Sequence, residues 1–384
     1  MSESTAFRQR KVRIAVVFGG RSSEHAISCV TADSVLRALD PERYEVLPIG
    51  ISTDGRWVLM ADEEIARLAI TDGRLPARID ETSGALVTMA ADPTARELTV
   101  HEPGAVPKAL GEVDVVFPLL HGPYGEDGTI QGLLDLAGVA YVGSGVLSSA
   151  VSMDKEFMRR LLVSAGLPVG RYVTVRRGQW RSDPEAVRAA VAALGFPVFV
   201  KPARAGSSMG ISKVHAPEQL AAAIEEAQRH DPKVVVEAMV AGREIEIGVL
   251  AASPPTGRPR VSAPAEIKVR GGHEFYDFQA KYLDGSTDID LPADLTDGQL
   301  EQLGELARAA FEALDCEGLA RVDFFLAEDP DGGEPRWLVN EVNTMPGFTT
   351  TSIFPQMWAA SGVSYAELVD CLVSEALSRP QGLR

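Results

Sequence analysis

Short apolar runs that stop at glycine or proline recur along this chain. Residues Val12–Phe18 (VRIAVVF) predict a buried strand that ends at Gly19-Gly20. Apolar residues that share one face then predict a helix, with Ser22 or Ser23 as its N-cap. A second strand is predicted at Tyr44–Ile51. This strand–turn–helix–strand order is typical of a doubly wound α/β domain.

The rest of the chain continues this mixed α/β pattern. The segment from Ser52 to Pro107 is polar and rich in turn residues, and we interpret it as an elaboration of the first domain. Further strands are predicted at Val113–Leu119, Arg171–Val175, Val198–Lys201, Val234–Glu237, Glu244–Leu250, Arg321–Leu326 and Trp337–Val342. Helices are predicted at Met153–Ser164, Ala189–Leu194, Gly298–Leu314 and Tyr365–Ser378.

Composition narrows the class of protein. The chain has 384 residues, 45% of them hydrophobic, which is enough for two or three domains with a large core. Its net charge of −17 argues against nucleic acid as the main partner, because the phosphate backbone would be repelled. The polar N-terminus lacks the apolar segment of a signal peptide, and no run of about 18 apolar residues predicts a membrane span. Three scattered cysteines form neither a disulfide framework nor a zinc motif, so we expect a cytoplasmic protein.

One loop is a candidate for phosphate binding. Lys201 leaves a predicted strand and a small-residue loop follows, Gly206 to Gly210, which includes Ser207 and Ser208. Glycines allow the backbone N–H groups to approach a phosphate closely, and the lysine adds a positive charge. The segment lacks the GxxxxGK[ST] pattern, and by itself an ordinary surface hairpin explains it equally well.

A pair of predicted strands carries candidate metal ligands. Residues two apart on a strand share a face, so Arg321 and Asp323 point the same way, as do Glu341 and Asn343. If the strands pair, Asp323, Glu341 and Asn343 can supply the hard oxygen ligands that Mg²⁺ prefers. The apolar residues around them disfavour a simple solvated ion pair.

Other candidates stay ambiguous when taken alone. Lys155 lies at a helix start, where a cation is unfavourable because it opposes the helix dipole. It can be an ordinary surface lysine, or a phosphate contact can explain its position. Glu24 suits a helix start electrostatically, but it can also bind a substrate ammonium group. A lone histidine such as His121 is more often structural. The aromatic segment Phe275–Tyr282 is either a packed loop or a lid that excludes water.

Taken together, these motifs resemble the D-alanine–D-alanine ligases of the ATP-grasp superfamily. The resemblance spans nearly the whole chain and is weakest at Ser52–Pro107. The strings that carry it are GGRSSEHAIS, HGPYGEDGTIQG, YVGSGVLSSAVSMDK, KPARAGSSMGISKV, EIEIGVL, FYDFQAKY, ARVDFF and NEVNTMPGFTTTS, in this order. The resemblance implies an N-terminal substrate-binding domain at 1–143, a central ATP-grasp domain at 144–236, and a C-terminal ATP-grasp domain at 237–384 with a lid at about 270–290.

The resemblance also implies roles for individual residues. ATP phosphates would contact Lys155, Lys201 and Ser208, adenine would contact Glu237, Ala238 and Val240, and the ribose would contact Glu244. Asp323, Glu341 and Asn343 would bind two Mg²⁺ or Mn²⁺ ions, with a monovalent cation left open. Glu24, steadied by Ser207 and Tyr282, would bind the ammonium group of the first D-alanine, with His121 near its carboxylate. Lys281 and Ser352 would receive the second D-alanine, and Arg321 with the Gly347 N–H would stabilise an oxyanion.

The expected activity is therefore ATP-dependent ligation of two D-alanine molecules through an acyl phosphate, in a homodimer as is usual among similar proteins. A D-alanine–D-lactate ligase is the nearest alternative, but the intact AKY ending at Tyr282 argues against it. A different ATP-grasp carboxylate–amine ligase should lack GGRSSEHAIS and FYDFQAKY. A non-catalytic ATP-binding regulator should lack Arg321 or a metal ligand, and all are present.

Overall fold

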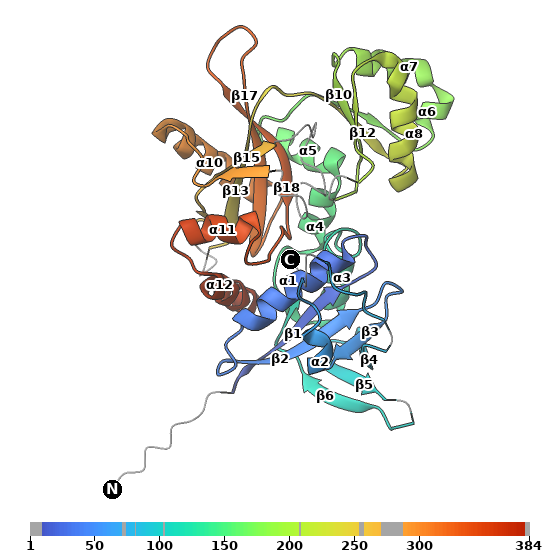
Figure 1. Cartoon of the computed structure of the whole chain (residues 1–384), viewed down its shortest axis with the longest axis vertical. Coiled ribbons are helices and arrows are strands. Elements are labelled where there is room, and N and C mark those ends of the chain that lie inside the picture. Colours follow the sequence, from blue (N-terminus) through green and yellow to red (C-terminus); the bar gives the residue numbers. More distant parts are fainter. Residues whose placement is uncertain are drawn as a thin grey trace.

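Three β-sheets organise the molecule. The structure is a computed structural model that describes residues 10–70, 74–80, 82–102, 104–206, 209–252, 257–269 and 287–380. The first sheet lies at the bottom of Figure 1, and the central and third sheets lie beside each other above it. This mixed α/β architecture confirms the fold class expected from the sequence.

The first sheet has eight strands in the order β6-β5-β4-β3-β2-β1-β7-β8. Its strands are β1 Val12–Gly19, β2 Tyr44–Ile51, β3 Trp57–Met60, β4 Gly84–Met89, β5 Glu97–His101, β6 Lys108–Glu112, β7 Val115–Pro118 and β8 Ala140–Tyr141, and its helices are α1 His25–Ala38, α2 Asp62–Ile65 and α3 Thr129–Ala137. The strands β2, β1, β7 and β8 pair in parallel, as the doubly wound opening predicts. The strands β3 to β6 extend the sheet in antiparallel fashion, so the polar segment after Ser52 does elaborate this unit.

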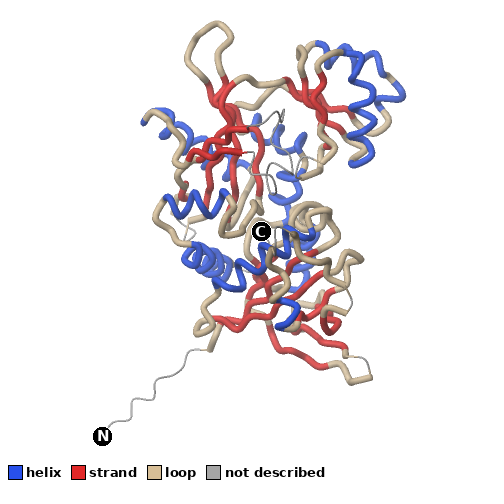
Figure 2. Tube along the Cα trace, in the orientation of Figure 1, coloured by secondary structure: helices blue, strands red, loops and turns tan. Residues whose placement is uncertain are grey.

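The central sheet has four antiparallel strands in the order β11-β10-β12-β9. Its elements are β9 Tyr172–Val175, α6 Gln179–Ser182, α7 Pro184–Ala192, β10 Val198–Pro202, β11 Ser212–Val214, η1 Pro217–Gln219, α8 Leu220–His230 and β12 Val234–Ala238. Figure 2 shows its helices on the side that faces away from the third sheet. The buried cluster of this unit draws only on residues between Val173 and Val236, so the unit has a core of its own.

The chain enters and leaves the central sheet at neighbouring points. The carbonyl of Arg171 accepts a hydrogen bond from the N–H of Ala238 (3.0 Å), and the Val240 side chain lies beside Gly170. The predicted boundary between residues 236 and 237 falls inside β12, which continues to Ala238. The division into three domains stays a prediction.

The third sheet has six strands, with β16-β15-β13-β17-β18 in line and β14 paired with β13. Its elements are β13 Gly242–Leu250, β14 Arg260–Val261, β15 Ala265–Val269, β16 Thr287–Asp290, α10 Asp297–Ala313, β17 Leu319–Ala327, β18 Arg336–Asn343, α11 Ile353–Ala360 and α12 Tyr365–Ser378. Two earlier helices, α4 Val146–Met153 and α5 Lys155–Ser164, also contact this sheet. Met158 and Leu162 of α5 belong to its buried cluster.

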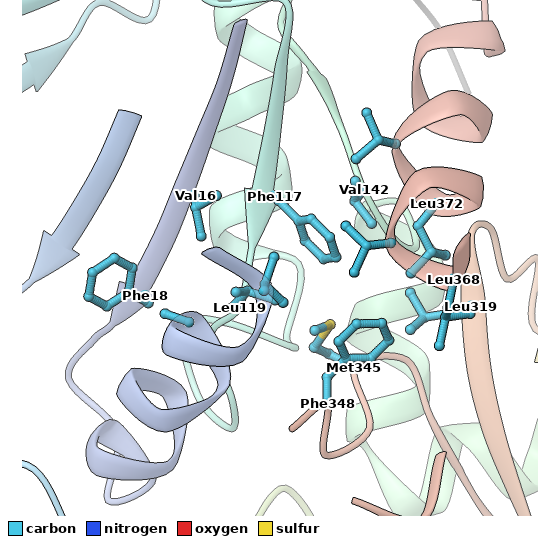
Figure 3. Packing of buried hydrophobic residues seen from close by; sticks show 14 of the residues in the cluster. Val16, Phe18, Phe117, Leu119, Val142, Leu319, Met345, Phe348, Leu368 and Leu372 are labelled. Carbon is cyan, nitrogen blue, oxygen red and sulfur yellow. The ribbon is translucent and has the colours of Figure 1, made fainter. Parts of the chain in front are cut away.

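The first and third sheets share one hydrophobic core. Phe117 on β7 and Phe348 after β18 stack edge to face with their ring centroids 6.1 Å apart. Figure 3 shows these two rings between β1 and helix α12, which contributes Leu368 and Leu372. Burial of this continuous apolar surface stabilises the two units together.

Three helix predictions were wrong in detail. The helix expected over Ala189–Leu194 is α7, which begins earlier, at Pro184, and ends at Ala192. Helix α1 has Glu24 as its N-cap, not Ser22 or Ser23. The Ser22 hydroxyl instead donates to the carbonyl of His121 (2.7 Å), which ties the turn after β1 to the turn after β7. The helix predicted at Met153–Ser164 begins at Lys155, because Asp154 adopts an extended conformation and caps α5 by accepting hydrogen bonds from the backbone N–H groups of Glu156 and Phe157.

Candidate active site

A cavity of about 520 Å³ lies where the three units meet. Residues from all three units line it, and those of the first unit come from its helices and loops. Fourteen of the residues implied by the family resemblance are among them: Glu24, His121, Lys155, Lys201, Glu237, Ala238, Val240, Glu244, Arg321, Asp323, Glu341, Asn343, Gly347 and Ser352. The other four, Ser207, Ser208, Lys281 and Tyr282, lie outside the described residues, as does most of the predicted lid.

Three cations surround one carboxylate at the central-sheet side of the cavity. The Lys201 ammonium lies 2.9 Å from Glu237 Oε2, and the Arg159 guanidinium lies 2.8 Å from Glu237 Oε1. Lys155 is buried in the same cluster, where its ammonium donates to the carbonyl of Ala205 (2.9 Å). Burial lowers the pKa of Lys155, and the nearby charges of Lys201 and Arg159 act in the same direction. The carboxylates of Glu341 and Glu237 act in the opposite direction and offset part of this positive charge, and the remainder favours an anion.

The helix start explains the position of Lys155. Its backbone N–H donates to the carbonyl of Ala203 (3.0 Å), just after β10. The cap residue Asp154 also binds the Lys233 ammonium, with N–O distances of 2.7 and 2.5 Å. Helix α5 is therefore tied to the end of β10, which brings Lys155 and Lys201 into one cluster although the residues are far apart in sequence.

The predicted metal ligands lie together on β17 and β18. These strands pair antiparallel, with Asp323 opposite Glu341 and Arg321 opposite Asn343. The Asn343 amide donates to Asp323 Oδ2 (3.1 Å), and rotating the amide would present its oxygen to the same space. Directly opposite residues have Cβ atoms only about 5 Å apart. Two carboxylates and an amide oxygen suit Mg²⁺ or Mn²⁺, so the residues fit a divalent ion.

Arg321 is held by two carboxylates. Its Nε lies 2.7 Å from Asp323 Oδ1 and 3.1 Å from Glu246 Oε2, and its Nη2 donates to Asp323 Oδ2 (2.8 Å). Although burial by itself lowers the pKa of Arg321, Asp323 and Glu246 outweigh it and raise the pKa well above the ordinary value. The guanidinium is thus fixed as a cation at the cavity wall.

Acidic groups gather at the first-sheet side of the cavity. Glu24 is buried, and a Cβ on Gly122 would lie 2.6 Å from Glu24 Oε2. A Cβ on Gly206, in the loop after β10, would lie 3.0 Å from the same oxygen. Both turns therefore approach the carboxylate closely only because they carry glycine. Burial lowers the pKa of the adjacent His121, which favours its neutral form.

Glu126 connects this acidic end to the loop after β18. Its Oε2 accepts from the backbone N–H of Gly122 (2.5 Å), and the carboxylate also accepts from the N–H of Met345. Burial, the charge of Glu24 and the more distant Glu341 raise its pKa to about 8, against the two hydrogen bonds. At neutral pH the side chain is therefore mostly a carboxylic acid.

The loop after β18 lines the cavity. Ser352 begins helix α11, but its hydroxyl turns into the loop, where it accepts from the Thr349 N–H (3.1 Å) and lies 2.7 Å from the Thr349 hydroxyl. Gly347 lines the cavity two residues before Thr349. Gly347 and Ser352 thus line the same cavity as Arg321.

The sequence analysis missed three residues of this site. Arg159 lies one helical turn after Lys155, an i, i+4 spacing that puts both on one face. Glu246 lies two residues after Glu244, on the same strand face. Both spacings were available as signals. Glu126 lies in the HGPYGEDGTIQG motif, but no local pattern indicates that it reaches Met345, 219 residues away by number (345 − 126).

Comparison with known proteins identifies the family. Two family models match, one described as D-ala D-ala ligase N-terminus over residues 13–144 and the other as D-ala D-ala ligase C-terminus over residues 161–374. The chain belongs to the D-alanine–D-alanine ligase family. The N-terminal match covers the first sheet, and the C-terminal match covers the central and third sheets.

Individual relatives agree with this family. The chain is 56% identical to a D-alanine–D-alanine ligase of Streptomyces griseus (100% of this chain, 97% of the relative) and 57% identical to one of Pseudarthrobacter chlorophenolicus (97% and 96%). The crystal structure of the VanG D-Ala:D-Ser ligase from Enterococcus faecalis superposes with a TM-score of 0.79 at 33% identity, covering 96% of this chain and 100% of that one. The structure of the D-alanine–D-alanine ligase from Coxiella burnetii superposes with a TM-score of 0.78 at 34% identity, covering 97% and 95%.

None of the helices in the described part of the chain has the length and apolar character that a membrane crossing needs. Within the same residues, no group of three His, Cys, Asp or Glu side chains forms a metal site.

Proposed function

We propose that this protein joins two molecules of D-alanine into D-alanyl-D-alanine, a precursor of peptidoglycan, and converts ATP to ADP and phosphate. One observation carries the proposal: a single cavity is lined both by two lysines suited to phosphates, Lys155 and Lys201, and by an oxygen-ligand set suited to Mg²⁺ on β17 and β18. Identity of 56% over the whole chain to a relative named D-alanine–D-alanine ligase supports the same reaction.

The first step activates a carboxylate, which is otherwise a poor acyl donor. A carboxylate oxygen of the first D-alanine attacks the γ-phosphorus of ATP, the bond to the β-phosphate oxygen breaks, and D-alanyl phosphate and ADP form. Lys155 and Lys201 hold the phosphates and offset the negative charge that spreads over the transferring group. Divalent ions held by Asp323, Glu341 and Asn343 would supply further charge neutralisation.

The second step forms the peptide bond. The neutral amine of the second D-alanine attacks the carbonyl carbon, an oxyanion develops, and phosphate leaves while the amine loses a proton. Arg321 and the Gly347 N–H donate to that oxyanion. Asp323 and Glu246 orient Arg321 before the reaction, so little reorganisation is needed as charge develops.

The remaining assignments follow the family resemblance. Glu24 binds the ammonium group of the first D-alanine, Ser207 and Tyr282 steady it, and His121 lies near the carboxylate. Lys281 and Ser352 bind the carboxylate of the second D-alanine. Ser208 contacts phosphate, Glu237, Ala238 and Val240 bind adenine, and Glu244 binds ribose. The lid at about 270–290 excludes water from the acyl phosphate.

The test is product formation from purified protein, ATP, Mg²⁺ and D-alanine. We expect D-alanyl-D-alanine by mass spectrometry, with one phosphate released for each dipeptide. Reactions with L-alanine, without an amino acid or without Mg²⁺ serve as controls and should form no product. ATP turnover that does not depend on D-alanine, or the absence of dipeptide, would contradict the proposal.

The acceptor needs its own measurement, because one structural neighbour is named a D-Ala:D-Ser ligase. Equal concentrations of D-alanine, D-serine and D-lactate should give mainly D-alanyl-D-alanine. A mixed product dominated by D-lactate would instead favour the alternative of a D-alanine–D-lactate ligase.

Three finer features belong to the same proposal and rest on the family resemblance. They are two divalent ions per site, a homodimer and a cytoplasmic location. Sedimentation equilibrium tests the dimer, titration of Mn²⁺ in the presence of a non-hydrolysable ATP analogue counts the ions, and cell fractionation tests the location. Activity with and without K⁺ decides whether a monovalent cation takes part.

A further inference from the structure

Arg159 is a buried cation that the proposed reaction does not use. It lies on α5, and its side chain is 4% exposed. Its Nη2 lies 2.8 Å from Glu237 Oε1, whereas its neighbour Arg160 is 56% exposed and pairs with Glu156. Removing a charged group from water is unfavourable unless a partner compensates, so a guanidinium at this depth requires a reason.

The surroundings of Arg159 point to Glu237 as that reason. Its guanidinium carbon lies 5.2 Å from the centre of the Tyr172 ring, and its Nε and Nη1 have no hydrogen-bond partner among the described residues. Glu237 is therefore its anionic partner within that part of the chain. The contact also joins two units, because α5 packs on the third sheet and Glu237 belongs to the central sheet.

The pair determines the state of the Glu237 carboxylate. Burial by itself raises the pKa of Glu237, but Arg159 first and Lys201 second outweigh burial and hold that pKa at about 2. The carboxylate is thus ionised and held by a cation at each oxygen. It can only accept hydrogen bonds, as the 6-amino group of adenine requires of a partner.

We propose that Arg159 is a positioning residue that holds Glu237 as an oriented hydrogen-bond acceptor and thereby gives the site its preference for adenine over hypoxanthine. The inference rests on the proposed function only in that Glu237 faces the base. Inosine triphosphate carries a carbonyl oxygen where ATP carries the amino group. That oxygen and the Glu237 carboxylate both accept hydrogen bonds, so they repel each other instead of pairing. A fixed carboxylate rejects it, and a loosely held one rejects it less well.

The test compares the binding of MgATP and MgITP by calorimetry without D-alanine. In Arg159→Met, which removes the charge but keeps the length, we expect the ratio of the two dissociation constants to move toward unity by about tenfold or more, the usual size for a lost hydrogen bond to a charged group. The matched control is Arg160→Met on the same helix, which should leave the ratio unchanged.

A double-mutant cycle separates positioning from general damage. If Arg159 acts through Glu237, adding Arg159→Met to Glu237→Gln should change the ratio no further. Equal weakening of ATP and ITP in Arg159→Met, or an additional change of the ratio in the double variant, would overturn the assignment.

Arg159→Lys covers the case in which Arg159→Met does not fold. It keeps the charge but not the planar guanidinium, so a smaller loss of the ATP preference is expected, and an unchanged ratio would also overturn the assignment. Because binding is measured without D-alanine, a protein that discriminates ATP from ITP but forms no dipeptide would contradict the proposed function alone.

Discussion

Glu341 and Asp323 face each other across β17 and β18, so replacing one of them tests the proposed metal site directly. Replacing Glu341 with Gln keeps the shape and removes one charged oxygen ligand. We expect kcat at saturating Mg²⁺ to fall about 100-fold or more, equivalent to roughly 3 kcal/mol of transition-state stabilisation. Steady-state phosphate release gives the rate, and circular dichroism checks the fold.

The matched control is Asp331→Asn, in the exposed connection between the same two strands. It removes the same charge about ten residues away in sequence (341 − 331) and should leave kcat unchanged. Near-normal turnover in folded Glu341→Gln would remove Glu341 from the metal site.

Glu126 predicts a pH dependence of stability. Its pKa rises from 4.5 to about 8 on folding, so the folded protein binds its proton more tightly than the unfolded chain does. The stabilisation is fully present below pH 4.5 and is lost as the pH rises toward 8 and above. Glu126→Gln mimics the protonated form at every pH, so the variant should gain stability over the wild type as the pH rises.

Urea unfolding at pH 5.5, 7 and 8.5, without nucleotide or metal, measures the difference between the two proteins. Taking the difference cancels groups that titrate equally in both. If the free energy of unfolding changes with pH in the same way in the wild type and in Glu126→Gln, then Glu126 is ionised in the folded protein at neutral pH.

Helix α5 is the element on which the proposed nucleotide side of the cavity depends. Asp154 caps it and also pairs with Lys233, and both side chains of that pair are about 10% exposed. We expect Asp154→Ala to lower the free energy of unfolding by about 2 to 4 kcal/mol, because the cap is lost and Lys233 keeps only Glu156 as its carboxylate partner. Because Lys155 follows directly, the KM for ATP should also rise.

Asp154→Asn is the informative comparison for this element. Asparagine caps helices as well as aspartate does but carries no charge for Lys233. It should therefore fall between the wild type and Asp154→Ala in urea unfolding. If both variants are equally unstable, the cap contributes nothing and the ion pair accounts for the whole effect.

Sequence pattern predicted most elements because their signals are local. The run Val12–Phe18 is buried almost throughout, and helix Tyr365–Ser378 has the predicted bounds. The break at Asp154 was missed because an N-cap aspartate follows the apolar end of α4 without glycine or proline. Likewise, strand alternation predicts that Asp323 and Glu341, the proposed metal ligands, lie together. Arg159 reaches Glu237 only through the packing of α5, which no local pattern encodes.

At the scale of the whole molecule, the distribution of cores predicts stepwise unfolding. The central sheet has its own buried cluster, whereas the first and third sheets share one. Arg379 strengthens that shared region, because its buried guanidinium donates to the carbonyls of Tyr141 and Gly143. We expect the central sheet to lose protection at a urea concentration different from that of the other two.

Hydrogen exchange followed by mass spectrometry can measure this directly. Peptides from β10 and β12 should exchange as one group, and peptides from β1 and α12 as another. Loss of protection in all four elements at one urea concentration would mean that the ion pair between Arg159 and Glu237 and its neighbours couple the units into one cooperative block.

The adjacent ends of the central sheet also have an evolutionary consequence. The hydrogen bond from Ala238 to Arg171 means that the polypeptide returns to the point from which it departed, so the intervening residues form a cassette within the gene. Recombination can exchange such a cassette between related genes without rerouting the rest of the chain. If the central unit binds the nucleotide, as proposed, such an exchange changes nucleotide recognition separately from amino-acid recognition, provided that the incoming segment keeps a carboxylate in the place of Glu237 to pair with Arg159.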